Sequence, residues 1–338
     1  MSFFKTLSSL LARYTALFVI GTAVITYFIP ELCTWVKGDA QTLVLGIIML
    51  SMGMTLGSND YKILARRPFD IIIGAIAQFT IMPAIAIAIA SFFNLSDGLT
   101  LGLVLVGCCP GGVSSNIMSF LCRGDVAFSV GMTTVSTIIA PVATPLLINL
   151  IIGQSIEINP WGMFKFMLLV TILPVGIGSL LNIMFGQSAR FQEIRSCMPG
   201  LAVIGFACIV GGVIAVHGEK FLDSGLIIFL CIALHNGLGY ILGFIAAMIS
   251  GMSYPKKKTL AIEVGVQNAG LATGLCGQFF PTTAEAAIAS AVSCVWHSIS
   301  GTILANFFLW LEKRRPNASE QAKLDSNMVS DARQSLSY

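Results

Sequence analysis

Charged side chains are scarce in this sequence. Asp, Glu, Lys and Arg make up 10% of the 338 residues, whereas 56% are hydrophobic and the mean hydropathy is +0.86. Soluble domains carry about 25% charged residues, so this chain has too few charges to cover a soluble particle of its length. The composition therefore excludes a water-soluble enzyme, a nucleic-acid-binding protein and a disordered chain. It predicts a polytopic membrane protein, with the lipid bilayer as its partner.

Residues that usually build catalytic or metal centres are also few or unsuitably spaced. There are three histidines, and the nine cysteines are scattered without the spacing of a disulfide framework or a zinc site. The apolar runs contain no His-Glu motif and no paired Asp residues. We therefore predict that the protein is not an enzyme, an intramembrane enzyme being a remote alternative. The sequence indicates no obligate protein partner.

Ten apolar runs are candidates to cross a bilayer as helices. A membrane-spanning helix needs about 20 mostly apolar residues. The runs are 14–36, 42–57, 69–93, 98–122, 126–152, 161–185, 198–216, 222–250, 257–279 and 283–311. The second is short, and the fourth and ninth are interrupted by residues that a regular membrane helix avoids.

Basic residues are divided unequally between the two sides that these runs define. Cytoplasmic loops carry an excess of Lys and Arg. With ten spans, sixteen of the 19 basic residues fall on one side, and the other side holds only Lys37, Lys165 and Lys220. The sequence therefore predicts ten spans with both termini in the cytoplasm. Residues 313–338 are polar and are interpreted as a mobile cytoplasmic tail.

The two interrupted runs are related to each other. Pro110, Gly111 and Gly112 break the fourth run, because proline lacks a backbone donor and glycine disfavours helix. Val106-Gly107 and Val264-Gly265 lie 158 residues apart, and the same offset relates Gln78 to Asn236, each a lone amide in an apolar helix. Five spans separate equivalent positions, and an odd number inverts the second copy. The pattern predicts two inverted repeats, residues 1–154 and 155–312, a hallmark of secondary transporters whose binding site lies where the breaks meet.

Glu263 is the only carboxylate in the middle of an apolar run. A charge at that depth costs about 2.5–3.5 kcal/mol on insertion scales, so it needs a proton or a bound cation. Neutral oxygen donors favour the cation; they are Gln78, Ser115, Asn116, Gln267, and Ser129 with Thr133 on one helix face. One negative charge among neutral oxygens suits Na⁺, since Ca²⁺ sites gather more carboxylates.

Four motifs together resemble the bacterial bile acid:sodium symporter family, which is related to the apical sodium-dependent bile acid transporter and includes ketopantoate/pantoate carriers. The motifs are Gly107-Cys-Cys-Pro-Gly-Gly with Ser115-Asn116, Arg123-Gly-Asp-Val-Ala-Phe-Ser-Val, Thr259-Leu-Ala-Ile-Glu-Val-Gly-Val-Gln-Asn-Ala-Gly-Leu-Ala, and Val295-Trp-His-Ser-Ile-Ser-Gly. The resemblance covers residues 12–312. It implies an all-α membrane protein of ten helices in two inverted five-helix repeats. Helices 1, 2, 6 and 7 form a panel, and helices 3–5 and 8–10 form a core in which discontinuous helices 4 and 9 cross.

The resemblance also implies two sodium ions and a substrate cavity between panel and core. One sodium site consists of Ser115, Asn116, Ser129, Thr133 and Glu263. The second consists of Gln78, Glu263, Gln267 and the carbonyls of Val264 and Val266. The substrate side consists of Gly112, Val113, Asn268, His297 and Ser298. Val113 and Ser298 stand where relatives usually have Thr and Asn, which bears on substrate identity and leaves the ion sites intact.

The function expected is sodium-coupled import of an organic anion by alternating access, across a bacterial inner membrane. A pantoate- or ketopantoate-like small acid is the preferred substrate, with a bile acid as another. The alternative is an efflux carrier for a metalloid or another anion that uses Cys108 and Cys109 at the first break.

Overall fold

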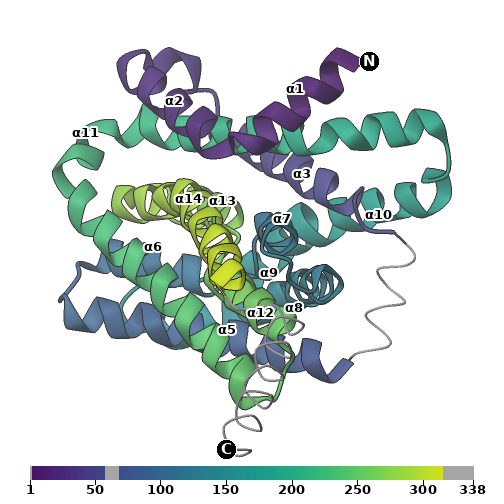
Figure 1. Cartoon of the computed structure of the whole chain (residues 1–338). Coiled ribbons are helices and arrows are strands. Elements are labelled where there is room, and N and C mark those ends of the chain that lie inside the picture. The colour runs from purple at the N-terminus through teal and green to yellow at the C-terminus, as the bar shows by residue number, and fades with distance from the viewer. Residues whose placement is uncertain (1, 58–67, 315–338) are drawn as a thin grey trace, which may run out of the picture.

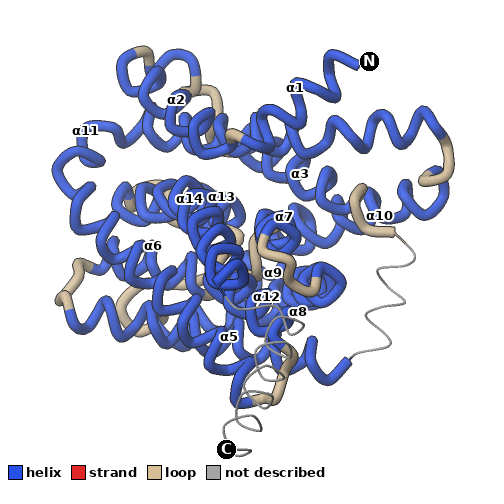
Figure 2. Tube along the Cα trace, in the orientation of Figure 1, coloured by secondary structure: helices blue, strands red, loops and turns tan. Residues whose placement is uncertain are grey.

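The computed structural model describes residues 2–57 and 68–314, and within them all regular secondary structure is helical (Figure 2). The chain therefore has the predicted all-α class. The elements are α1 (Ser2–Arg13), α2 (Thr15–Phe28), η1 (Pro30–Leu32), α3 (Asp39–Gly53), α5 (Pro68–Phe92), α6 (Asp97–Gly107), α7 (Ser114–Leu121), α8 (Val126–Ile152), α9 (Pro160–Met167), η2 (Leu168–Ile172), α10 (Leu173–Phe185), α11 (Ala189–Ile249), α12 (Tyr254–Gly265), α13 (Ala269–Phe279) and α14 (Ala284–Arg314).

Six segments of the described chain are long and apolar enough to cross a membrane, or seven if α1 and α2, bent by 85°, form one span. The helices α3 and α6 are shorter apolar helices. By length and composition, these helices indicate a multi-pass membrane protein. The count of ten spans and the inverted repeat remain predictions.

The seventh and eighth predicted spans are joined in α11, which runs without interruption for 61 residues. The connection between these two spans is therefore helical, while Ala189–Lys220 and Leu226–Ile249 are still separate candidate spans. Polar residues such as Glu219 and Lys220 suggested a loop, but both are good helix formers, and no proline follows Pro199 in this helix. Figure 1 shows that α11 bends between its first half (teal) and its second half (green), so that the two halves run in different directions.

The first predicted span, 14–36, is also different in the structure. Its helix α2 ends at Phe28, because Pro30 disfavours helical backbone at Ile29, where φ is −132°. The segment before it is the separate helix α1. The predicted tail lies outside the described residues from Arg315 onward, whereas Lys313 and Arg314 form the last turn of α14.

The helices fall into two groups (Figure 1). The first half of α11 packs against α1, α2 and α3, and α3 also packs against α10. The other group contains α5, α6, α7, α8, α12, α13, α14 and the second half of α11. The main hydrophobic core extends over both groups, and a smaller second cluster lies among α7, α11, α12 and α14. The two interrupted helix pairs, α6 with α7 and α12 with α13, both lie in the second group.

A topology measurement checks the uneven distribution of basic residues. A reporter fused after Tyr338 that is active only in the cytoplasm should give full signal, and a periplasm-specific reporter at the same position should give none. A reporter in the loop around Lys37 should give the reverse pattern. A periplasmic signal at Tyr338 would contradict the ten-span count.

Candidate functional site

Both predicted helix interruptions are present, and they contact each other through the backbone. Gly112 N donates to Val266 O at 2.8 Å, and Asn268 N donates to Pro110 O at 2.8 Å. This reciprocal pair forms an isolated antiparallel bridge between Gly111 and Gln267. Four helix ends therefore meet at one point, which we call the crossing: α6 and α12 end there, and α7 and α13 begin there.

Glycine at position 112 is required by this close approach. A Cβ built on Gly112 would lie 2.7 Å from the carbonyl oxygen and 3.1 Å from the carbonyl carbon of Gln267. Both atoms belong to the backbone, so neither can turn aside as a side chain could. A Cβ on Gly111 would lie 3.1 Å from Oε2 of Glu263. The glycine pair thus brings the crossing and the carboxylate of Glu263 together.

Glu263 lies at the centre of the residues predicted for the first sodium site. Its Oε1 accepts hydrogen bonds from Ser115 Oγ at 2.5 Å and from Ser129 Oγ, and its Oε2 accepts one from Thr133 Oγ1 at 2.9 Å. Asn116 Oδ1 accepts from Ser129 Oγ at 2.9 Å. All five predicted residues are therefore in one cluster, and the Glu263 side chain is buried within it.

Hydrogen bonds join three of the residues predicted for the second sodium site, which are Gln78, Gln267 and Val264. The other two have different partners: Val266 O accepts from Gly112 N, and the Glu263 carboxylate bonds to the hydroxyls of the first site. Gln78 Nε2 donates to Gln267 Oε1 at 2.6 Å and to Cys109 O at 3.2 Å, and Gln267 Nε2 donates to Val264 O at 2.5 Å. Gln78 Oε1 is buried and has no hydrogen-bond partner in the part of the chain that is described. An oxygen left without a donor in this position can serve as a ligand for a cation.

The amide related to Gln78 by the 158-residue offset behaves similarly. Asn236 Nδ2 donates to Gly265 O at 2.7 Å, at the end of α12, as Gln78 Nε2 donates to Cys109 O just after α6. Each lone amide thus satisfies a carbonyl that a helix break leaves without an intrahelical partner. Both side chains are buried.

The five residues predicted for the substrate side are divided by the structure. Gly112 lies in the crossing, and Val113 precedes α7, which begins without a side-chain cap. Asn268 uses its Oδ1 to cap α13, accepting from Leu271 N at 3.1 Å. His297 Nδ1 contacts Gln267 O at 3.3 Å, whereas Ser298 Oγ donates to Cys294 O of its own helix at 3.4 Å. Within the described residues, the hydrogen bond of Ser298 stays in its own helix and does not reach the crossing.

The two cysteines at the first break lie in the protein interior. Cys108 and Cys109 are fully buried, and Cys108 O accepts a hydrogen bond from Thr144 Oγ1 at 2.7 Å. No group of three or more His, Cys, Asp or Glu side chains within residues 2–57 and 68–314 could hold a metal ion.

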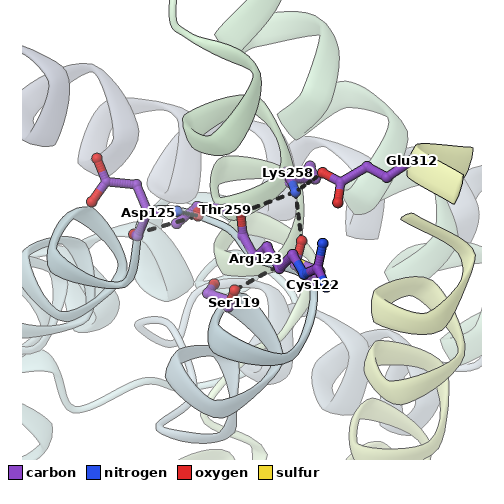
Figure 3. Close-up of polar contacts among 7 residues, drawn as sticks. All are labelled: Ser119, Cys122, Arg123, Asp125, Lys258, Thr259 and Glu312. Carbon is purple, nitrogen blue, oxygen red and sulfur yellow. Dashed lines mark hydrogen bonds and ion pairs between the residues drawn. The ribbon is translucent and has the colours of Figure 1, made fainter. Parts of the chain in front are cut away.

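Lys258 was missed as a residue of interest, because its position in the run Lys256-Lys257-Lys258 is typical of a membrane-edge anchor. In the structure its side chain is fully buried beneath the end of α7, and its Nζ reaches two carbonyls and Glu312 (Figure 3). The sequence does place Lys258 five residues before Glu263 on the same helix, and this closeness to the buried carboxylate could have drawn attention to it.

The family model described as the Sodium Bile acid symporter family matches residues 42–224 of the chain. The chain belongs to the sodium/bile acid symporter family. It is 39% identical over 324 residues to the uncharacterized sodium-dependent transporter YocS of Bacillus subtilis, covering 96% of this chain and 99% of the relative. It is 36% identical over 281 residues to the probable sodium/metabolite cotransporter BASS1 of rice, covering 82% of this chain and 68% of the relative. The Arabidopsis thaliana protein of the same name is also 36% identical, over 82% of this chain and 69% of its own length.

Membership of the sodium/bile acid symporter family confirms the predicted resemblance and the prediction that the chain is a transporter and not an enzyme. Sodium dependence is part of the family description and of the relatives' names.

Proposed function

We propose that this protein is a sodium-coupled symporter that imports a small organic anion through a site at the crossing. The single observation that carries the proposal is the burial of one carboxylate, Glu263, among three hydroxyl groups and an amide oxygen at the point where both helix pairs are interrupted. A buried carboxylate with neutral oxygens around it matches a monovalent cation.

Two sodium ions share Glu263 in this proposal. The first is held by Ser115, Asn116, Ser129, Thr133 and Glu263. The second is held by Gln78, Glu263, Gln267 and the carbonyls of Val264 and Val266. Support for the second set comes from Gln78 Oε1, which is buried without a hydrogen-bond partner among the described residues. Because the ligands come from α5, α7, α8 and α12, binding of the ions would order the crossing and thereby prepare the anion site.

The substrate in this proposal is a small hydroxy acid such as pantoate, with ketopantoate as a close relative. Its carboxylate would be held by amides at the N-terminus of α7, which lacks a side-chain cap. His297 Nδ1 lies 3.3 Å from Gln267 O, which can only accept, so the proton of a neutral His297 is on Nδ1 and Nε2 is left as an acceptor. Nε2 is buried with no partner in the described chain, and a substrate hydroxyl would satisfy it.

Uptake of labelled pantoate into proteoliposomes tests the proposal. We expect accumulation with an inward sodium gradient and background uptake when potassium replaces sodium at equal ionic strength. A panel of unlabelled organic anions, including bile acids, added as competitors identifies the preferred substrate. Arsenite transport, assayed beside Cys108→Ser with Cys109→Ser, tests the efflux alternative. Sodium-independent uptake that follows a pH gradient would contradict the proposal.

Alternating access is proposed to be a movement between the two groups of helices described above. The panel group consists of α1, α2, α3, α10 and the first half of α11, and the core group consists of the helices around the crossing. The helices α3 and α13 belong to different groups in this proposal and are in contact: Gln41 Nε2 donates to Thr273 O at 3.2 Å, and a Cβ on Gly274 would lie 2.6 Å from Leu45 Cδ2. A disulfide between cysteines introduced at Leu45 and Gly274 should therefore stop uptake.

The disulfide offers its own control, because reduction should restore uptake in the same sample. Each single variant, Leu45→Cys or Gly274→Cys, reports the effect of the substitution alone. Sodium should still raise the thermal unfolding temperature of the oxidised double variant, since the ion ligands lie outside this contact. Uptake at the reduced rate in the fully oxidised protein would show that the two groups do not move against each other here.

A further inference from the structure

Lysine 258 is the largest side chain that is fully buried in the described part of the chain. Burying an ammonium group costs free energy unless it is paired and hydrogen-bonded. Here Nζ donates to Cys122 O at 2.5 Å, to Arg123 O at 3.0 Å and to Glu312 Oε1 at 2.5 Å (Figure 3). Each of its three donor hydrogens therefore has an acceptor.

Two of these acceptors are carbonyls at the C-terminal end of α7. This helix has only eight residues, and isolated helices of that length are unstable in water. The last carbonyls of a helix lack intrahelical partners and carry partial negative charge, so a cation placed there is stabilising. Lys258 thus acts as a C-terminal cap on α7 that is provided by α12.

The next residue, Thr259, holds the beginning of α8. Its Oγ1 accepts a hydrogen bond from Asp125 N at 2.9 Å, and Asp125 Oδ1 accepts from Phe128 N at 3.0 Å as the N-cap of α8. A Cβ on Gly124 would lie 2.5 Å from Thr259 Oγ1, so only glycine permits this contact. Lys258 and Thr259 together attach the end of α7 and the start of α8 to one turn of α12.

The same three helices carry the proposed first sodium site. Ser115 and Asn116 lie on α7, Ser129 and Thr133 lie on α8, and Glu263 lies on α12 about 7.5 Å along the helix from Lys258. Any slide of α7 along α12 would change the separation between Ser115 and the Glu263 carboxylate by a similar amount. The attachment at Lys258 opposes such a slide.

We propose that Lys258 is a positioning residue for sodium: it caps α7 from α12 and thereby fixes the α7 ligands relative to Glu263. Glu312 on α14 balances its charge and ties that helix to the same point. Lys258 touches neither the ion nor the substrate in this proposal. The inference rests on the proposed sodium-coupled function.

The test measures sodium dependence in Lys258→Met, which keeps the aliphatic stem and removes the ammonium group. Uptake of labelled pantoate at increasing sodium should show a half-saturating sodium concentration raised about tenfold, the scale expected for losing a hydrogen bond from a charged group. The maximum rate and the half-saturating pantoate concentration at saturating sodium should stay within about twofold of wild type, because the ligands themselves remain. Sodium-dependent thermal stabilisation of the purified protein should shift in parallel.

Two further variants keep the test decisive. Lys257→Met removes the same charge from the neighbouring, partly exposed lysine and should leave sodium dependence unchanged. We expect a smaller effect from Glu312→Gln than from Lys258→Met, because the Glu312 side chain is 25% exposed. The Glu312→Gln substitution also leaves the Cys122 and Arg123 carbonyls bonded to Lys258. Glu312→Gln should raise the half-saturating sodium concentration about threefold. If Lys258→Met does not fold, Glu312→Gln provides the test.

The outcomes separate this inference from the proposed function. Wild-type protein without any sodium dependence would contradict the proposed function itself. Sodium-dependent wild type with unchanged half-saturation in Lys258→Met, or in Glu312→Gln if only that variant folds, would overturn the inference and leave the function intact. A lower maximum rate at unchanged sodium half-saturation would also overturn it, since that is the signature of a purely structural role.

Discussion

Replacing Glu263 by Gln is expected to reduce sodium-driven uptake to near background at physiological sodium. The substitution keeps the size of the side chain and one acceptor oxygen, which can serve Ser115 or Thr133 but not both, and it removes the only formal charge available to both proposed ions. Removing one partner of a buried charge pair costs about 3–5 kcal/mol, which corresponds to a loss of sodium affinity of about 100-fold or more. The protein should remain folded, because neutralising a buried carboxylate removes its insertion cost.

The measurement is the initial uptake rate as a function of sodium concentration in proteoliposomes. Glu285→Gln is the matched control. Glu285 lies in the first turn of α14, away from the crossing, and accepts a hydrogen bond from Ser96. The Glu285→Gln variant should therefore keep wild-type sodium dependence. Asn116→Ala removes a neutral ligand, and its half-saturating sodium concentration should lie between those of Glu285→Gln and Glu263→Gln. Unchanged half-saturation in Glu263→Gln would refute the assignment of the ion sites.

Replacing Gly112 by Ala is expected to reduce uptake strongly for a different reason. The added Cβ would lie 2.7 Å from Gln267 O, and overpacking of this kind costs about 1–3 kcal/mol. The strain falls on the bridge itself, so the hydrogen bonds between Gly112 N and Val266 O and between Asn268 N and Pro110 O must lengthen. Uptake should fall at least tenfold, since ligands on both sides of the bridge are displaced.

Gly176→Ala provides the control for Gly112→Ala. Gly176 lies in α10 and has no heavy atom within 4 Å of a built Cβ, so alanine there should be neutral or slightly stabilising. Thermal unfolding and uptake should be measured on both variants. A Gly112→Ala protein with wild-type uptake would mean that the crossing relaxes without functional cost.

The sequence was informative where a residue type has one physical use. Pro110 with two glycines located the first break, and Glu263 in an apolar run located the centre of the polar cluster. The 158-residue offset led to Gln78 and Asn236, both of which bond to carbonyls at helix breaks. These positions are readable because breaking a helix or burying a charge in a membrane is costly, so few residues are placed there without a reason.

Other features depend on tertiary contacts that the sequence does not express. The join within α11 was missed, because Glu219 and Lys220 suit a loop and a helix equally well. Lys258 was only counted among the basic residues of the cytoplasmic side, since burial of a lysine is visible only when its acceptors, Cys122 O and Glu312, are placed beside it. Ser298 was placed on the substrate side by the family resemblance, and in the structure its hydroxyl bonds to its own helix, as serine commonly does in membrane helices.

Equilibrium binding of ²²Na⁺ to the purified protein tests the central claim most directly, because it requires no knowledge of the substrate. We predict saturable binding to the wild type that unlabelled sodium displaces and potassium does not, and loss of that binding in Glu263→Gln but not in Glu285→Gln. Absence of saturable binding to the folded wild type, or equal binding to Glu263→Gln, would contradict a sodium site built on the carboxylate at the crossing.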